Sequence, residues 1–145
     1  MRKVVNKHIG AYGILIQDEK IALIKKACGG YYGKLDLPGG GVEHTETPTE
    51  ALYREVMEEA GVKVISHKLL DVVTNNLIWQ MDEDIIEDLH HFGILYVIKA
   101  NGVLKEIPDG IDSLGCKWYE ISKLKKKDLT PFVIYGLEKL GYKLR

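Results

Sequence analysis

The sequence predicts an α/β domain in which helices cover a mixed β-sheet. Three observations lead to this fold class: β-branched apolar segments lie on both sides of one well-capped helix, a second amphipathic helix follows them, and no repeat or linker separates these elements. Strands that alternate with helices along a chain are typical of layered α/β folds. The length of 145 residues fits one domain over residues 1–145.

Composition narrows the classes of protein. Hydrophobic residues make up 46% and charged residues 28% of the chain, as in ordinary globular proteins. No apolar stretch is long enough for a membrane span or a signal peptide, and we therefore expect a cytoplasmic protein with no membrane partner. Cys28 and Cys116 lack metal-ligand spacing and are expected to be reduced thiols. A net charge of -1 gives no general attraction to a nucleic acid polymer.

The first half of the chain contains a hairpin and two glycine-rich segments. Residues 8–16 and 21–24 are apolar and β-branched, and residues 17–20 form a polar turn between them, which predicts a β-hairpin. A loop rich in glycine and tyrosine follows at residues 29–33. A short strand at residues 35–37 then leads into Pro38-Gly39-Gly40-Gly41.

The central helix has clear signals at both ends. Thr47 is a suitable N-cap, Pro48 occupies the first helical position, and Glu50 lies three residues after the cap, which together form a capping box. The helix should extend to about Ala60, because Gly61 is a typical C-terminal stop.

The second half of the chain contains further strands and one helix. Residues 62–78 predict one or two strands, residues 92–98 and 117–119 predict one strand each, and residues 131–140 predict an amphipathic helix. The acidic segment 79–91 is expected to be a polar loop, with a lid or a homodimer contact as the alternative. His90 and His91 make a poor metal site, because neighbours on a strand point to opposite faces.

Three carboxylates lie together on the central helix. At about 100° per residue, Glu55, Glu58 and Glu59 fall within roughly one hundred degrees of arc. The adjoining arc is apolar and is expected to face the core; it contains Leu52, Tyr53, Val56, Met57 and Ala60. Like charges at these spacings destabilise a helix by roughly 0.2–0.5 kcal/mol per pair. A hard cation such as Mg²⁺ or Mn²⁺ would relieve the repulsion, and a solvated acidic face is the alternative.

A longer motif surrounds these carboxylates. Gly40 is followed after five residues by Glu46, and after seven more by Arg54-Glu55-Val56-Met57-Glu58-Glu59-Ala60-Gly61-Val62. This string resembles the Nudix box of MutT-like hydrolases at every fixed position. The resemblance implies an α/β/α sandwich with a central mixed sheet. It also implies divalent-metal ligands at Glu55, Glu58 and Glu59, helped by the Gly39 or Gly40 carbonyl, while Arg54 and Glu46 orient the helix.

The implied reaction is Mg²⁺- or Mn²⁺-dependent hydrolysis of a diphosphate linkage. Glu58 or Glu59 is a candidate general base, with Arg54 counted among the catalytic residues. Some family members take the base from a later loop, where Glu106, Asp109 and Asp112 are weaker candidates. The chain departs from many relatives at Leu35 and Thr45, and residues 113–117 lack an acidic residue, so the base stays unassigned at this point.

The predicted partner is a small-molecule nucleotide, most simply a nucleoside triphosphate cut to monophosphate and pyrophosphate. The alternatives are an ADP-ribose or other nucleoside diphosphate derivative hydrolase, and a non-catalytic nucleotide sensor on the same fold. Residues near the glycine-rich segments are candidates for substrate binding, and these are Tyr31, Tyr32, Lys34 and His44. A homodimer is a further expectation.

Overall fold

The computed structural model describes residues 1–107 and 113–145. Its strands and helices, in chain order, are β1 (Arg2–Gln17), β2 (Lys20–Lys26), β3 (Leu35–Asp36), β4 (Gly39–Gly41), α1 (Pro48–Ala60), β5 (Lys63–Asp82), β6 (Ile85–Asn101), β7 (Ser113–Glu120) and α2 (Pro131–Lys139). Two single-turn 3₁₀ helices, Ile121–Lys123 and Lys126–Asp128, connect β7 to α2.

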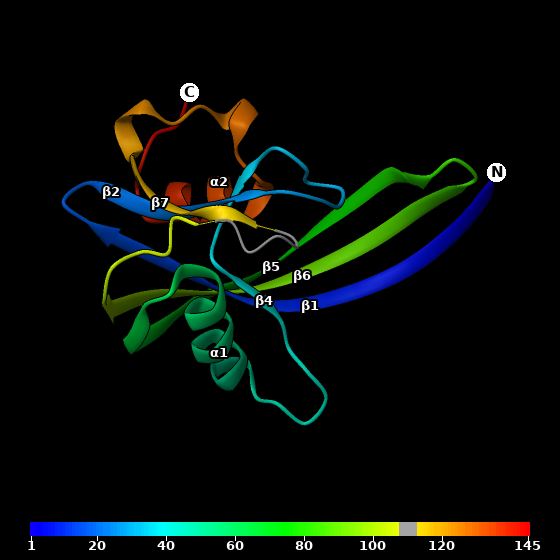
Figure 1. The fold of residues 1–145 in the computed structure, drawn as a ribbon. Helices are drawn as coiled ribbons and strands as arrows, with labels where there is room; N and C mark the ends of the chain where they lie inside the picture. The colour runs from blue at the N-terminus through cyan, green and yellow to red at the C-terminus, as the bar shows by residue number, and fades with distance from the viewer. Residues whose placement is uncertain (108–112) are drawn as a thin grey trace.

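The sheet is mixed, as predicted, and β1 lies at its centre (Figure 1). The strand order is β3-β2-β1-β6-β5, with β4 paired to β1 and β7 paired to β2. The β1–β6 pair is parallel over residues 2–15 of β1, whereas the other pairs are antiparallel. The short β4 pairs with β1 through Gly10↔Gly41 and Tyr12↔Gly39, which places the glycine run beside the centre of the sheet.

The two long helices cover opposite faces of the sheet and complete the predicted α/β/α sandwich. Helix α1 buries Leu52, Val56 and Ala60 in one apolar cluster, together with Leu15 and Ile98 of the sheet. On the other face, α2 packs into a second cluster whose members include Ile14, Leu95, Phe132, Val133 and Leu137. Neither helix of the described ranges is long and apolar enough to cross a bilayer.

The expectation of a polar loop at residues 79–91 is wrong. Strands β5 and β6 form a long antiparallel hairpin that turns between Asp82 and Ile85, and with the start of β1 it extends past the helices as an arm (Figure 1). Glu83 and Asp84 lie in the turn, whereas Glu87 and Asp88 lie on β6 and are paired with side chains of β5 across the hairpin. Trp79 Nε1, for example, donates to Glu87 Oε1 at 2.7 Å. The high charge of residues 79–91 therefore obscured the alternation of side chains that is typical of a strand.

The core-facing arc of α1 is narrower than predicted. Leu52, Val56 and Ala60 are fully buried, but Tyr53 is 37% exposed and Met57 is 46% exposed. These two side chains lie outside the fully buried face of the helix, and the Tyr53 hydroxyl contacts His67 Nδ1 at the exposed side of β5 at 2.9 Å. The carboxylate-bearing Glu59 is the residue that turns inward, with only 8% exposure.

Candidate active site

Local sequence signals fix the start and the end of helix α1. The Thr47 hydroxyl accepts a hydrogen bond from Glu50 N at 3.2 Å, and the Glu50 carboxylate accepts one from Thr47 N at 2.9 Å. This is the predicted capping box. Gly61 ends the helix with a left-handed φ of 73°, which favours glycine. The helix that carries the acidic residues therefore has a defined register.

Arg54 ties the loop before the helix to the helix itself. Its guanidinium donates to both carboxylate oxygens of Glu46, at 2.8 and 2.9 Å, and to the carbonyl oxygen of Gly41 at 3.0 Å. Because the charged, bidentate contact favours the ionised acid, the pKa of Glu46 falls to about 2. Arg54 and Glu46 thus tie the loop before α1 to the helix.

Arg54 also reaches two of the three predicted metal ligands. Its Nη1 lies 2.7 Å from Glu55 Oε1 and 3.4 Å from Glu58 Oε2. The side chain of Glu55 is 18% exposed, while that of Glu58 is 57% exposed. One cation therefore holds both carboxylates on the same side of the helix.

Glu55 and Glu59 of α1 lie against strand β4. Glu59 Oε1 accepts a hydrogen bond from Gly39 N at 3.1 Å. A Cβ at Gly40 would lie only 2.5 Å from Glu55 Oε2, so glycine is what lets this backbone approach the carboxylate. The strand and the acidic face of α1 form one oxygen-rich surface that includes the predicted ligands Gly39 and Gly40.

The chemistry of these donors suits a hard divalent cation. Within the described ranges, no three His, Cys, Asp or Glu side chains form a ready-made ligand cluster. Mg²⁺ does not require one, because it is commonly held by one or two carboxylates with water and substrate phosphates as the other ligands. Glu55, Glu58 and Glu59, with a nearby glycine carbonyl, supply hard oxygen donors of this kind.

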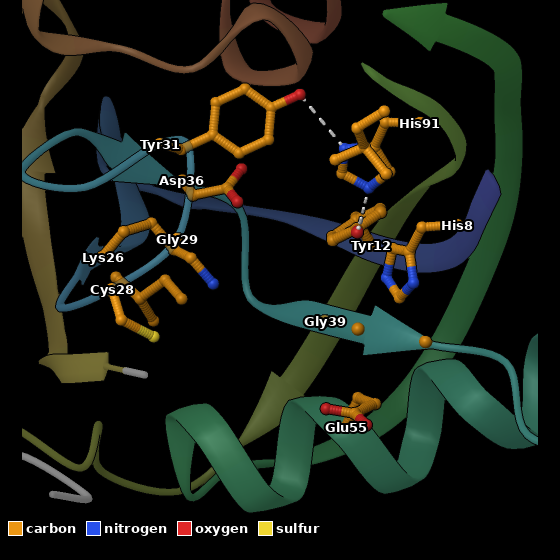
Figure 2. A pocket seen from close by; sticks show the side chains of 14 residues that line it. His8, Tyr12, Lys26, Cys28, Gly29, Tyr31, Asp36, Gly39, Glu55 and His91 are labelled. Carbon is orange, nitrogen blue, oxygen red and sulfur yellow. Dashed lines mark hydrogen bonds between the residues drawn. The ribbon is translucent and has the colours of Figure 1, made fainter. Parts of the chain in front are cut away.

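A cavity of about 300 Å³ opens beside Glu55 and the glycine run (Figure 2). One end is formed by Glu55, Gly39, Gly40 and Gly41, and the rest is formed by residues of β1, β2, β3, β6 and the glycine-rich loop. These other lining residues are His8, Tyr12, Ile24, Lys26, Cys28, Gly29, Tyr31, Asp36, Leu89 and His91. The cavity therefore joins the acidic face of α1 to a wall of aromatic and polar side chains.

Hydrogen bonds organise that wall. His91 Nε2 lies 2.6 Å from the Tyr12 hydroxyl, and His91 Nδ1 lies 3.2 Å from the Tyr31 hydroxyl (Figure 2). Asn75 Nδ2 donates to the Tyr31 hydroxyl at 3.0 Å. Burial lowers the pKa of His91 to about 4, so the ring is neutral near pH 7. Burial also raises the pKa of Tyr12 and of Tyr31, which keeps both hydroxyls protonated.

Asp36 brings a buried carboxyl group to the same cavity. Its Oδ1 accepts hydrogen bonds from Leu37 N at 2.8 Å and from the Thr130 hydroxyl at 2.7 Å. Burial raises the pKa of Asp36, and these hydrogen bonds and the charge of Lys26 oppose the shift. This part of the cavity therefore contains hydrogen-bond acceptors and neutral rings as well as a lysine.

The predicted substrate-binding residues are not all at this cavity. Tyr31 lines it. Tyr32 is 72% exposed, Lys34 Nζ donates to the carbonyl oxygen of Lys127 at 3.4 Å, and His44 is exposed in the loop before α1. None of these last three is among the lining residues, and their roles stay predictions.

Sequence reasoning did not place His8, His91 or Asp36 at a binding site. A signal was present for His91, because it directly precedes the predicted strand 92–98 and alternates with Gly93 and the buried Leu95. Of the candidate bases in the later loop, Glu106 is exposed, and Asp109 and Asp112 lie outside the described residues.

Comparison with known proteins identifies the family. The NUDIX domain family model matches residues 7–140. The chain belongs to the Nudix family. It is 30% identical over 125 residues to an ADP-ribose pyrophosphatase of Methanocaldococcus jannaschii. The aligned region covers 86% of this chain and 69% of the relative. It is 31% identical over 107 residues to diphosphoinositol polyphosphate phosphohydrolase 2 of Rattus norvegicus, covering 72% of this chain and about half, 52%, of that relative.

Solved structures support the fold. A MutT NUDIX hydrolase from Burkholderia pseudomallei aligns with a TM-score of 0.77 and 24% identity, over 93% of this chain and 98% of the other. A NUDIX hydrolase from Nitrosomonas europaea aligns with a TM-score of 0.72 and 20% identity, over 93% and 88% of the two chains. Together with the family match, these findings make the protein a Nudix hydrolase with the MutT-like fold.

Proposed function

We propose that this Nudix hydrolase cleaves the diphosphate linkage of a nucleoside diphosphate derivative in a Mg²⁺-dependent reaction. The observation that carries the proposal is the position of Glu55. It lies where the acidic face of α1 meets a cavity of about 300 Å³, and Arg54 fixes its carboxylate at 2.7 Å. A diphosphate at this junction would have carboxylates on one side and room for the rest of the nucleotide on the other.

The bound metal would neutralise phosphate oxygens and activate water for attack on phosphorus. Glu55, Glu58 and Glu59 would hold it, with the Gly39 or Gly40 carbonyl as a further donor. Arg54 Nη1 contacts the carboxylates of both Glu55 and Glu58, which preorganises the site before substrate arrives. The same guanidinium, anchored on Glu46, prevents the two acids from moving apart.

Glu58 is the better placed of the two candidate general bases on the helix. Its side chain is 57% exposed and can reach a water molecule from solvent. Glu59 is buried, and its Oε1 already accepts the hydrogen bond from Gly39 N. In the proposed mechanism Glu58 accepts a proton from the attacking water, while Glu59 keeps strand β4 in place.

The relatives guide the choice of substrate. The relative that covers 86% of this chain is named an ADP-ribose pyrophosphatase, which favours ADP-ribose or a similar nucleoside diphosphate derivative here. Nucleoside triphosphates, the first expectation from the sequence, are the second candidate class. A cytoplasmic location and a homodimer stay predictions from the sequence, and light scattering after size-exclusion chromatography tests the homodimer.

A substrate panel tests the proposal. The protein is incubated with Mg²⁺ and, separately, with ADP-ribose, a dinucleoside polyphosphate, ATP and dGTP, and the products are separated by ion-exchange chromatography. We expect AMP and ribose 5-phosphate from ADP-ribose, and loss of turnover when EDTA replaces Mg²⁺. Release of pyrophosphate from the triphosphates alone would favour the second class. No product from any compound would favour a non-catalytic sensor.

A further inference from the structure

A chain of hydrogen bonds crosses the cavity wall away from Glu55. It connects the Tyr12 hydroxyl to His91 Nε2 at 2.6 Å, and His91 Nδ1 to the Tyr31 hydroxyl at 3.2 Å (Figure 2). We call these three residues the Tyr–His–Tyr relay. All of them line the cavity, and they come from β1, β6 and the glycine-rich loop.

Counting protons shows that the relay has one hydroxyl proton left over. A neutral imidazole has one N–H and one lone pair, and each hydroxyl has one proton, which gives three protons for two hydrogen bonds. If Nε2 is protonated, it donates to Tyr12 while Tyr31 donates to Nδ1, and the Tyr12 proton remains available. If Nδ1 is protonated, it donates to Tyr31 while Tyr12 donates to Nε2, and the Tyr31 proton remains. The tautomer of His91 therefore decides which tyrosine can donate into the cavity.

We propose that the Tyr–His–Tyr relay is a specificity device that presents a single hydroxyl donor to an uncharged acceptor on the nucleoside part of the substrate. Tyr31, the more exposed of the two tyrosines, would donate to that acceptor, which is a carbonyl oxygen, a ring nitrogen or a sugar oxygen, while the buried Tyr12 donates to His91 Nε2. His91 is the positioning residue between them. This inference rests on the proposed function, because it assigns the far end of the same cavity.

The charges around the relay favour an uncharged group over a phosphate. Asp36 brings a buried carboxyl group to the same cavity, which in either protonation state offers no positive charge to an anion. Burial raises the pKa of Asp36 and the charge of Lys26 opposes that shift, so part of the lysine's charge acts on this acid. His91 contributes no positive charge near pH 7, since burial lowers its pKa. The phosphates are better accommodated at the Glu55 end, where a metal balances the acids.

Two close approaches hold the relay rigidly. A Cβ at Gly10 would collide with the Tyr12 hydroxyl, so only glycine allows the Tyr12 ring to lie over this part of β1. On the other side, the Phe132 ring packs on His91 with centroids 4.6 Å apart, and a Cβ at Gly93 would lie 2.6 Å from a Phe132 ring carbon. A donor fixed in this way can discriminate between ligands, because it does not rearrange to suit each one.

Steady-state kinetics of Tyr31→Phe tests the proposal. The variant keeps the ring and removes the hydroxyl. We expect KM for the best substrate of the panel to rise about fivefold to tenfold, as for one lost hydrogen bond, with kcat within about twofold of wild type. Tyr135→Phe is the matched control, because it removes a hydroxyl that donates to Asp71 at 2.6 Å on the opposite side of the molecule from α1. An unchanged KM, or a fall in kcat alone, would overturn the proposal.

Nitrogen NMR of the histidine rings separates this proposal from the proposed function. In ¹⁵N-histidine-labelled protein with Mg²⁺, we add the non-hydrolysable α,β-methylene analogue of ADP-ribose. We expect the Nδ1 and Nε2 signals of His91 to move in opposite directions as the tautomer changes, and Tyr31→Phe to abolish the shift. His67, which contacts Tyr53 at 2.9 Å outside the cavity, is the internal reference.

The outcomes are distinguishable. If the panel shows no hydrolysis but the analogue moves the His91 signals, the proposed activity fails and the relay stands. If ADP-ribose is hydrolysed while the His91 signals stay unmoved at saturating analogue, the relay is refuted and the proposed function stands. Equal shifts at His67 and His91 would also refute the relay, since they would report a global change.

Discussion

Replacing Gly40 with alanine tests whether the position of Glu55 sets the rate of hydrolysis. A Cβ at residue 40 would lie 2.5 Å from Glu55 Oε2 and 2.7 Å from Glu55 Cδ. Ordinary van der Waals contact begins at 3.4 Å, so the carboxylate has to retreat by about 0.9 Å. A displacement of about 1 Å at a reacting centre can lower a rate about 100-fold. We therefore expect kcat of Gly40→Ala to fall by about 10-fold to 100-fold.

Arg54 makes this displacement informative. Because its Nη1 holds Glu55 Oε1 at 2.7 Å, the carboxylate cannot swing away without losing a charged hydrogen bond or pulling the guanidinium with it. The backbone at residue 40 has no left-handed φ, so alanine introduces no strain of its own there. Any fall in the melting temperature of Gly40→Ala in a circular dichroism melt should therefore reflect the loosened Arg54–Glu55 contact and not backbone strain.

A double-mutant cycle with Glu55→Ala supplies the control. Glu55→Ala removes the atoms that the new methyl group would meet, so Gly40→Ala should add little further loss of kcat in that background. Rates are measured with Mg²⁺ at saturating substrate for all four proteins. Wild-type kcat in Gly40→Ala, or losses that simply multiply in the double variant, would refute the idea that Gly40 acts through Glu55.

Three further predictions concern the base, the helix cap and the buried histidine. Glu58→Gln should lower kcat at least about 100-fold, whereas Glu138→Gln on α2 should match the wild type in the same assay. Thr47→Ala should reduce the free energy of unfolding in urea by about 1 kcal/mol, because it removes the N-cap hydrogen bond; an unchanged midpoint would contradict this. The pKa of His91 is about 4 in the folded protein and 6.5 unfolded, so the unfolded chain binds the proton first as pH falls, and stability is lost from pH 6.5 down to 4. Between pH 7 and 5 the wild type should therefore lose about 2 kcal/mol more stability than His91→Gln, and parallel losses in the two proteins would show that His91 is not shielded.

The parts of the fold that could be predicted are those with local signals. The capping box at Thr47 and the glycine at residue 61 set the ends of α1, and the structure confirms both. Helix α2 begins at Pro131 as expected and ends at Lys139. The box itself is a pattern of rigid spacings, so its loop, helix and Arg54 contacts follow from sequence positions less than 25 residues apart.

The β5–β6 arm could not be predicted in the same way. Strand pairing joins residues by backbone hydrogen bonds and tolerates charge on an exposed face, so the acids between Asp82 and Asp88 hid an extended strand. Similarly, the spacing of apolar residues indicates which side of a helix faces the core, but it does not indicate how wide the buried face is. Tyr53 and Met57 fit the helical spacing of apolar residues, yet their side chains remain partly exposed outside the buried face of α1.

The two ends of the active site consequently have different origins in the sequence. The proposed metal end is local, because Gly39 and Gly40 belong to β4 and the three glutamates belong to α1, the next element in the chain. The other end is assembled by topology: Tyr12 contacts His91 across 79 residues, and His91 contacts Tyr31 across 60. Parallel pairing of β1 with β6 sets His8 opposite His91 and so determines the position of the aromatic side chains that line the cavity.

This division has a consequence for how substrate choice can change. Substitutions on the arm or in the glycine-rich loop alter the wall without touching the hydrogen bonds of Arg54, so they can change KM between substrates while metal affinity is retained. Substitutions in the box should act on every substrate alike, because in the proposed mechanism each substrate needs the same oxygen donors. Magnesium affinity measured by calorimetry in Tyr31→Phe should therefore equal that of the wild type. A weakened magnesium affinity would mean that the two ends are coupled, and that specificity and metal binding cannot vary independently in this fold.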